Sequence, residues 1–247
     1  MTIAIIIPAK NEEATLPKLL DSLAIQTTMP DEVVVMNSHS TDGTADVARS
    51  YADRLPIQVH DAKIKGVAAA RNEGVTYASS EILIFIDADA SLPNVFVQGI
   101  QTAMKQKSFD IGAFRQVMLS DNFGLRFGAN RMNDYVRLMS KTPWPIFFSC
   151  VLIRRSLFEK IGGFDPEIFI MEDYDLALRG RRGGGTFRYL KHPFFYASGR
   201  RYEASGGAKD IFRGVYAELY RYTHGMRITK PLFEYKMGGQ SSEKKKK

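Results

Sequence analysis

Short apolar runs alternate with helical patterns along the first 110 residues of the chain. The runs are typical of buried strands, and the segments between them place apolar side chains at helical spacing. The predicted strands are residues 2–8, 32–36, 56–60 and 81–87, and the predicted helices are residues 11–26, 40–52 and 65–78, with a further helix opening at Pro93. This alternation favours an α/β fold with a mostly parallel central sheet and helices on both faces.

The pattern changes after residue 110, but no linker, repeat or low-complexity stretch divides the chain there. The elements expected beyond that point are a strand at 109–119, a helix at 122–140, a strand and a short helix within 145–165, a helix at 172–184 and an amphipathic helix at 210–225. We therefore expect a single domain over residues 1–235, followed by a disordered basic tail at 236–247.

Polar side chains gather where three of the predicted strands end. The stretches are PAKNEE at 8–13, NSHSTDG at 37–43 and DADAS at 87–91. In open parallel α/β sheets, ligands bind at the carboxyl ends of the strands. We therefore expect the three stretches to converge on one cleft.

The fourth apolar run is followed by two aspartates, Asp87 and Asp89. One interpretation is that they cap a helix or solvate a loop. The other is a divalent-cation site, because residues i and i+2 of an extended segment point the same way. Adjacent carboxylates also repel each other unless a cation lies between them. Magnesium and manganese commonly bind one or two carboxylates together with substrate phosphates. The position at the ligand-binding edge favours the cation site.

A second acidic cluster, Glu172, Asp173 and Asp175, opens the predicted helix at 172–184. Carboxylates in the first helical turn interact favourably with the helix dipole, which is sufficient to explain Glu172 and Asp175. The cluster also follows GGFDPEIFI, a glycine- and aromatic-rich stretch that can project an acidic side chain into a cleft. Asp173 is therefore a candidate general base.

Composition and charge narrow the class of protein. The net charge of +7 includes Lys244–Lys247, and without them 30 basic residues face 27 acidic ones, so we expect no nucleic-acid binding. The lysine tail is either a binding arm or a solubility feature.

Cys150, the single cysteine, cannot form an internal disulfide and lies in an apolar run that suits the core. With no signal peptide and no apolar run of roughly 20 residues, we expect a cytoplasmic protein, and peripheral contact at the cytoplasmic membrane face stays open.

Five stretches occur in an order that resembles the family-two glycosyltransferases of the GT-A fold. They are IIIPAKNEE, EVVVMNSHSTDGTADVA, GVAAARNEGV, ILIFIDADA and LIRRSLFEKIGGFDPEIFIMEDYDLALR, and the resemblance extends approximately from Ile3 to Glu203. It implies a nucleotide-sugar-binding half at 1–110 and an acceptor-binding half at 111–235. It also implies transfer of a sugar from a UDP, GDP or dTDP donor to a hydroxyl group of a glycan or a lipid-linked acceptor.

The resemblance assigns roles to individual residues. Asp87 and Asp89 match the D-x-D motif that holds manganese or magnesium, and Asp173 matches the general base of an inverting transfer. Basic side chains would neutralise the leaving diphosphate, although the alternative for each of them is a solvated surface position. The further substrate-binding candidates are Pro8, Ala9, Glu12, Asn37, Ser38, Lys65, Arg71, Ala88, Glu172, Arg200 and Arg201.

Two stretches depart from the family pattern. Lys10 replaces an aromatic residue of the first loop, and Asn37 and Ser38 replace two aspartates after the second strand. An aspartate there typically accepts a hydrogen bond from the base, whereas an asparagine side chain can accept or donate one. The identity of the base therefore stays open.

The region 187–235 contains 12 of the 28 aromatic residues, interleaved with basic ones. Three interpretations stay open. The region is a platform for acceptor sugars, an attachment to a membrane with a lipid-linked acceptor, or a helix that packs an aromatic stripe on the core. His192, within this region, is either a metal or phosphate ligand or a structural residue.

Other classes of protein fit the sequence less well. A nucleotidyltransferase or a dinucleotide-binding oxidoreductase needs a glycine-rich loop after the first strand, where this chain has PAKNEE. The alternative that remains is a sugar-nucleotide-binding or membrane-peripheral protein without transfer activity.

Overall fold

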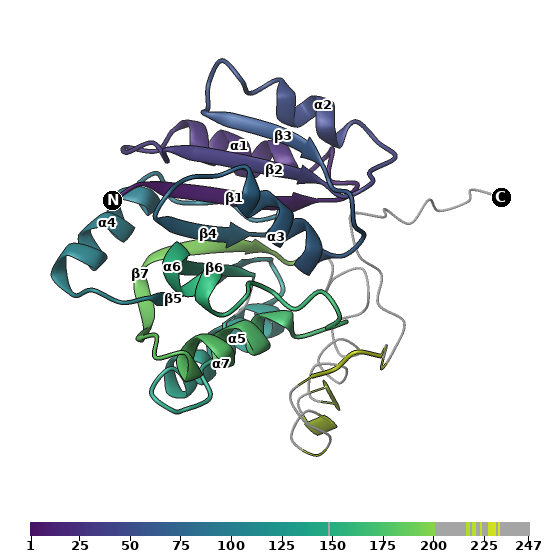
Figure 1. Ribbon diagram of the computed structural model, residues 1–247. Helices are drawn as coiled ribbons and strands as arrows, with labels where there is room; N and C mark the ends of the chain where they lie inside the picture. Colours follow the sequence, from purple (N-terminus) through teal and green to yellow (C-terminus); the bar gives the residue numbers. More distant parts are fainter. Residues whose placement is uncertain are drawn as a thin grey trace.

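The computed structural model describes residues 1–147, 149–200, 216–217, 219–220, 223, 227–230 and 232. These residues form a seven-stranded sheet with the strand order β3-β2-β1-β4-β6-β5-β7 (Figure 1). The strands are β1 (Ile3–Ala9), β2 (Glu32–Asn37), β3 (Ile57–Asp61), β4 (Ile82–Ile86), β5 (Ile111–Leu119), β6 (Cys150–Arg154) and β7 (Phe187–Ser198). Neighbouring strands are parallel except that β6 runs antiparallel to β4 and β5. The mostly parallel α/β sheet predicted from the sequence is confirmed.

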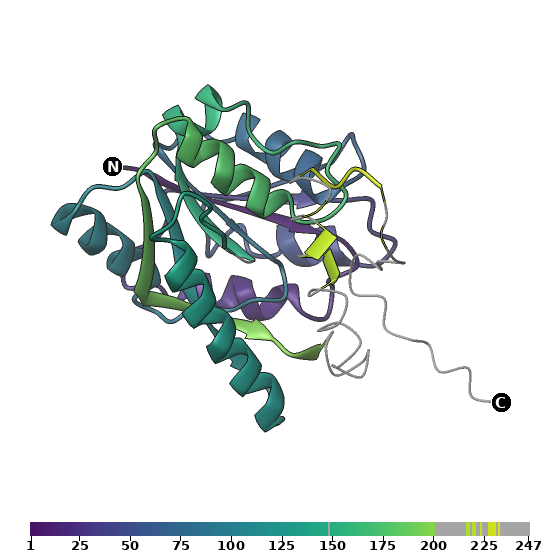
Figure 2. The same cartoon turned by 90° about the horizontal axis from the view of Figure 1, so that it is seen from below.

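Helices cover both faces of this sheet (Figures 1 and 2). They are α1 (Leu16–Ala24), α2 (Thr44–Arg49), α3 (Val67–Thr76), α4 (Phe96–Gln106), α5 (Phe123–Met139), α6 (Arg155–Lys160) and α7 (Glu172–Arg182). Buried side chains of α1, α2 and α4 join one hydrophobic cluster, and those of α3, α5, α6 and α7 join a second. Within the described ranges, no helix combines the length and apolarity that a bilayer span requires.

The strands contribute to both clusters, because successive side chains of a strand point to opposite faces. In β1, Ile3 and Ile5 enter the cluster beneath α1, whereas Ala4 and Ile6 enter the cluster beneath α3. Every residue of β4 is buried. Strands that are covered on both faces need apolar residues at each position, which explains the unbroken apolar runs in the sequence.

The aromatic region that begins at Phe187 forms an edge strand. β7 pairs with β5, and a bulge takes residues 191–193 out of the ladder. The interpretation of the region as a helix with an aromatic stripe is therefore wrong for 187–198. The predicted helix at 210–225 lies mostly outside the described residues, and the predicted tail at 236–247 lies wholly outside them.

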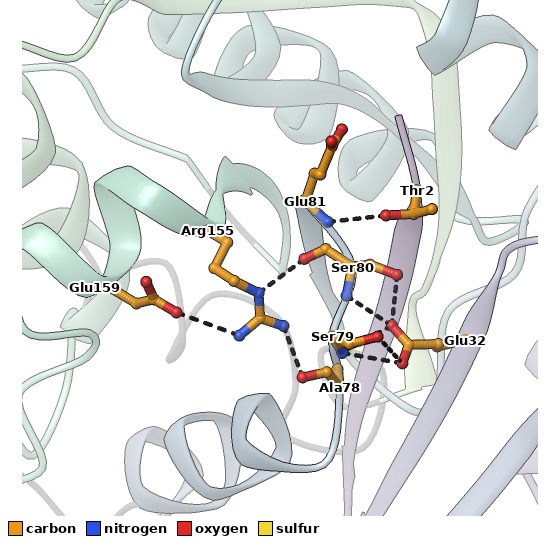
Figure 3. Close-up of polar contacts among 8 residues, drawn as sticks. All are labelled: Thr2, Glu32, Ala78, Ser79, Ser80, Glu81, Arg155 and Glu159. Atoms are coloured by element: carbon orange, nitrogen blue, oxygen red, sulfur yellow. Dashed lines mark hydrogen bonds and ion pairs between the residues drawn. The ribbon is translucent and has the colours of Figure 1, made fainter.

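A polar network ties strand ends together at the amino edge of the sheet (Figure 3). Glu32, at the start of β2, accepts hydrogen bonds from the backbone N–H groups of Ser79 and Ser80, just before β4. Burial would raise the pKa of Glu32, but the hydrogen bonds from Ser80 and Ser79 lower it. Arg155, at the start of α6, donates to the carbonyl oxygens of Ser80 at 2.8 Å and Ala78 at 2.9 Å. The network therefore fixes β2, β4 and α6 relative to one another.

α3 approaches the sheet closely because Gly74 carries no side chain. A Cβ atom at Gly74 would lie 2.7 Å from Cγ2 of Ile6 and 3.0 Å from Cγ of Met36. Ile6 is fully buried and its branched side chain has few alternative rotamers. We expect Gly74→Ala to lower the free energy of unfolding by about 1–3 kcal/mol, as measured by urea denaturation.

Gly128→Ala is the matched control, because a Cβ atom at this exposed position of α5 would meet no atom within 4 Å. Alanine favours a helix over glycine, so this substitution should raise the free energy of unfolding by about 0.5–1 kcal/mol. Similar effects of the two substitutions would contradict the close approach of α3.

Candidate active site

The carboxyl ends of six strands meet at one edge of the sheet, because only β6 runs in the opposite direction. Pro8 and Ala9 close β1 at this edge, and Asn37 and Ser38 lie at the end of β2. Residues 87–89 follow β4, between the end of β1 and the start of β6. The three polar stretches of the sequence therefore share the edge at which such sheets bind ligands.

The loops after β1 and β2 hold each other through side-chain oxygens. The backbone N–H of Asn11 donates to Oγ of Ser40 at 3.0 Å, and the N–H of Thr41 donates to Oδ1 of Asn11 at 2.8 Å. The N–H of Glu12 donates to Oγ1 of Thr44 at 2.8 Å. These bonds satisfy backbone groups that the strand ladders leave unpaired, so both loops have defined conformations.

Backbone strain gathers at the same edge. The described non-glycine residues with positive φ are Asn11 (53°), His39 (58°), Ser149 (52°) and Met171 (65°). The first two follow β1 and β2, Ser149 precedes β6, and Met171 precedes the acidic start of α7. A side chain in the left-handed region costs of order 1–3 kcal/mol, and such residues cluster at functional sites.

Arg71, from α3, joins carboxylates of both acidic clusters. Its Nη2 lies 3.0 Å from Oδ1 of Asp87, and its Nη1 lies 2.9 Å from Oε1 of Glu172 and 3.0 Å from Oδ1 of Asp173. Its guanidinium carbon lies 5.1 Å from the centre of the Phe164 ring. Because Arg71 is only 4% exposed, its interpretation as a solvated surface residue is wrong.

The four charged groups of this Arg71 cluster (Arg71, Asp87, Glu172 and Asp173) do not balance. Burial would lower the pKa of Arg71, but Asp173, Glu172 and Asp87 raise it, so the guanidinium stays charged. One cation faces three carboxylates, which leaves a formal excess of negative charge. A buried excess of this kind is costly unless a further cation or a proton neutralises it.

The pKa of Asp173 responds to this imbalance. Burial, the neighbouring Glu172 charge and Asp87 raise it well above the ordinary value of 3.8, although Arg71 acts in the opposite direction. The side chain is 18% exposed, so part of it reaches solvent. Asp175 differs, because its Oδ2 accepts a hydrogen bond from Nε of Arg179 at 2.7 Å within α7. The structure thus gives Asp175 a local structural partner and leaves Asp173 as the candidate base.

Asp87 and Asp89 lie in a turn. The backbone N–H of Ala90 donates to the carbonyl oxygen of Asp87 at 3.1 Å, directly after β4 ends. The extended conformation expected for residues 87–89 is therefore wrong, because β4 ends at Ile86. The carbonyl oxygen of Ser149 accepts from the N–H of Asp87 at 3.2 Å, so the start of the turn is fixed against β6.

The donor chemistry of this turn nevertheless suits a divalent cation. Oδ1 of Asp87 is taken by Arg71, and no described residue is found to hydrogen-bond its Oδ2. Asp89 adds a half-buried carboxylate two residues later. No group of three His, Cys, Asp or Glu side chains within the described ranges is arranged to hold a metal ion. Substrate phosphates would therefore complete the shell, as is common for magnesium.

Arg200 and Glu12, two of the predicted substrate-binding residues, contact each other at this edge of the sheet. Nη2 of Arg200 lies 3.0 Å from Oε2 of Glu12, although 188 residues separate them. The hydroxyl of Thr15 also donates to this oxygen. Lys65 is exposed in the loop before α3, and Arg201 lies outside the described residues.

Asp61 is a candidate site residue that the sequence reasoning missed. It ends β3 opposite Asn37, whose Nδ2 donates to Oδ1 of Asp61 at 2.6 Å. The backbone N–H of Ser40 donates to Oδ1 of Asn37 at 3.3 Å. Oγ of Ser38 is buried and has no hydrogen-bond partner among the described residues. The sequence could have indicated Asp61, because this residue directly follows the predicted strand 56–60. The carboxyl ends of parallel strands lie at the same edge of a sheet.

His192 lies apart from the Arg71 cluster. It is exposed in the β7 bulge, where its ring centre lies 5.9 Å from that of Phe194. Two strands, β6 and β5, separate β7 from β4.

Cys150 is 1% exposed at the start of β6, and burial raises the pKa of its thiol. Cys150 thus has the surroundings of a core residue.

Sequence comparison decides the family. Residues 4–162 match the profile of Glycosyl transferase family 2, which is more than half of the chain. The chain belongs to this family. A PGL/p-HBAD biosynthesis glycosyltransferase of Mycobacterium bovis is 33% identical over 180 residues, which are 71% of this chain and 68% of that protein. The family-two glycosyltransferase predicted from the five sequence stretches is therefore confirmed, and with it the enzyme class.

Solved structures support the GT-A fold of this family-two chain. TarS of S. aureus in complex with UDP-GlcNAc has a TM-score of 0.67 at 20% identity, and the match covers 80% of this chain and 58% of TarS. The mannosyltransferase PcManGT of Pyrobaculum calidifontis, in complex with GDP-Man and Mn²⁺, has a TM-score of 0.64 at 23% identity, with 78% and 56% covered. The chain thus spans less than two thirds of either structure.

Removal of the Arg71 charge should destabilise the enzyme. We expect Arg71→Met to lower the free energy of unfolding by about 3 kcal/mol, because three carboxylates lose their common cation. The deficit should shrink as the pH is lowered from neutral through the raised pKa of Asp173, because protonation of Asp173 removes one uncompensated charge. Urea denaturation across this pH range measures both effects.

Arg49→Met is the matched control. Arg49 pairs with Asp46 at 2.9 Å on the surface, where the two side chains are 53% and 87% exposed. Its loss should change the free energy of unfolding by less than about 0.5 kcal/mol. An Arg71 variant that resembles this control at every pH would contradict the buried cluster.

Proposed function

We propose that this glycosyltransferase moves a sugar from a nucleoside diphosphate to a hydroxyl group of a glycan or a lipid-linked acceptor, with inversion at the anomeric carbon. The Arg71 cluster carries the proposal. In it, one buried cation contacts both Asp87, which follows β4, and Asp173, the candidate base. The cluster unites a carboxylate suited to metal and diphosphate with one suited to accept a proton.

The donor would bind in the loops after β1, β2 and β4. UDP-GlcNAc in the TarS complex and GDP-Man in the archaeal complex support a nucleoside-diphosphate sugar of the UDP, GDP or dTDP type. Asn37 and Asp61 would meet the base, since their hydrogen-bonded pair combines an amide with a carboxylate acceptor. Pro8, Ala9 and Ser38 would lie beside the donor at the same edge of the sheet.

Departure of the diphosphate requires neutralisation of its developing negative charge. A Mn²⁺ or Mg²⁺ ion held by Asp87 and Asp89 would supply this neutralisation, and the Mn²⁺ of the archaeal complex supports a metal in such folds. Arg200 and Lys65 are basic side chains that could reach the diphosphate from the same edge. Arg71 acts as a positioning residue, because its terminal nitrogens already hold Asp87 and the start of α7.

The acceptor hydroxyl would pass its proton to Asp173 as its oxygen bonds to the anomeric carbon. The bond between that carbon and the diphosphate oxygen breaks in the same displacement, on the opposite face, so the configuration inverts. The raised pKa of Asp173 favours this proton transfer, and its contact with Arg71 fixes the orientation of the carboxylate.

Asp173→Asn and Asp89→Asn should separate proton transfer from donor binding. Asp173→Asn should lower kcat by at least about 10²-fold, while a nucleoside diphosphate with Mn²⁺ still raises the melting temperature. Asp89→Asn should lose that rise, because the metal then has one carboxylate fewer. Thermal-shift assays with UDP, GDP and dTDP, and an assay of released diphosphate, provide the two readouts.

Asp46→Asn, an exposed aspartate on α2, is the control and should match the wild type in both assays. Full transfer by Asp173→Asn would overturn its role as base. If the wild type bound a nucleotide sugar but neither transferred nor hydrolysed it, the alternative of a binding protein would replace the proposal.

Glu172→Gln should reveal the pKa of Asp173 through activity. The enzyme should gain activity as the pH rises through this pKa, because Asp173 accepts a proton only when it is ionised. The Glu172 charge helps to raise that pKa above 3.8, so its removal should shift the acidic limb of kcat/KM to lower pH. Glu159→Gln, an exposed change on α6, should leave the limb in place. An unmoved limb in Glu172→Gln would argue against Asp173 as the titrating group.

A further inference from the structure

α5 exposes apolar side chains on the face that points away from the core. Phe123 is 72% exposed, Phe127 is 54% exposed and Leu138 is 62% exposed. At 3.6 residues per turn, these positions lie along one side of the helix, opposite the buried Val136. The rings of Phe123 and Phe127 lie 6.2 Å apart and stack on each other in the open.

The amino-terminal part of α5 receives little cover from the described chain. No residue from Asp121 to Met132 is buried. In Figure 2, this long teal helix extends to the lower margin of the molecule. Contiguous exposed apolar side chains of this kind mark an interaction surface more often than an inert one.

Basic side chains flank the apolar stripe. α5 contains three arginines and one acidic residue, Asp134, whose Oδ2 lies 2.9 Å from Nη2 of Arg131. The guanidinium carbon of Arg131 also lies 5.4 Å from the centre of the Phe127 ring. We call the stripe and its arginines the outer α5 face, which consists of Phe123, Phe127, Leu138, Arg126, Arg131 and Arg137.

The fold brings the outer α5 face close to the edge that carries the active site. β5 ends at Leu119, at the edge where β4 also ends, and Asn122 caps α5 by accepting from the N–H of Leu125 at 3.2 Å. The side chain of Asn133 bonds both the N–H and the carbonyl oxygen of Gln116, so α5 is fixed against β5. Phe123 therefore projects from the active-site edge of the molecule.

We propose that the outer α5 face binds the surface of an anionic phospholipid bilayer. Aromatic and aliphatic side chains flanked by arginines are typical of helices that lie in the membrane interface. Anionic headgroups complement the arginines and the four terminal lysines, which supply most of the net charge of +7. A second copy of the chain fits less well, because a two-fold interface through this stripe would bring the same arginines together. The proposal goes beyond the transfer reaction, since it concerns where the protein acts.

Co-sedimentation of the full chain with lipid vesicles tests the proposal. The wild type should bind phosphatidylcholine vesicles that contain roughly 30% phosphatidylglycerol, bind pure phosphatidylcholine far less, and dissociate as salt is raised. Phe123→Ser/Phe127→Ser should lower the partition coefficient by at least about tenfold. Ile25→Ser/Val95→Ser removes exposed apolar side chains elsewhere, of 63% and 46% exposure, and should bind as the wild type does.

Several outcomes would overturn the proposal. One is equal binding to neutral and anionic vesicles, and another is unchanged vesicle binding by the Phe123→Ser/Phe127→Ser variant. The third is that the wild type forms a dimer, the variant is monomeric, and neither binds vesicles. A second readout places the only tryptophan in the face, with Phe127→Trp in a Trp144→Phe background. Its fluorescence should shift to the blue with anionic vesicles, and an unshifted spectrum would count against insertion.

The vesicle test and the transfer test can fail independently. Donor hydrolysis in solution without vesicles should be the same for the wild type and for Phe123→Ser/Phe127→Ser, because neither ring contacts the Arg71 cluster. Vesicle binding by a protein without transfer activity would support membrane binding by the outer α5 face and overturn the proposed reaction. Transfer activity without vesicle binding would support the reaction and overturn membrane binding.

Discussion

A buried guanidinium requires carboxylates around it, and this requirement organises the active-site edge of the enzyme. Arg71 is nearly inaccessible to solvent, so its charge must be met inside the protein. α3 supplies the cation, the turn after β4 supplies Asp87, and the first turn of α7 supplies Glu172 and Asp173. Because the partners come from three elements, the cluster holds the proposed donor and acceptor sides in one fixed relation. The excess of carboxylates in turn raises the pKa of Asp173.

Strained loops surround this cluster, and the rest of the fold supports them. Met171 adopts a φ of 65° immediately before Glu172, and Ser149, with a φ of 52°, accepts the backbone hydrogen bond of Asp87. Such conformations persist only where surrounding contacts determine them. The polar network around Glu32 and Arg155 at the opposite edge, and the contact of Gly74 with the sheet, anchor the elements that carry these loops.

The sequence predicts the fold better than it predicts the site. The apolar runs of β1, β2 and β4 are readable because both faces of these strands are buried. β7 was missed, because it lies at the sheet edge and its bulge at 191–193 interrupts the alternation. Motifs located Asp87 and Asp173, but not the ion pairs that connect them to Arg71 across 16 and 102 residues. The Asn37–Asp61 pair likewise depends on strand register, which local pattern does not specify.

The central claim is that Arg71 and Asp173 act as one electrostatic unit. A double-mutant cycle of Arg71→Met and Asp173→Asn, followed by urea denaturation at neutral pH, measures their coupling most directly. If the two groups act as one unit, their coupling free energy is at least about 1 kcal/mol, and the double variant is more stable than the sum of the single effects implies. Effects that are additive within about 0.5 kcal/mol would contradict this claim, because substitutions at residues that share no contact change the free energy of unfolding additively.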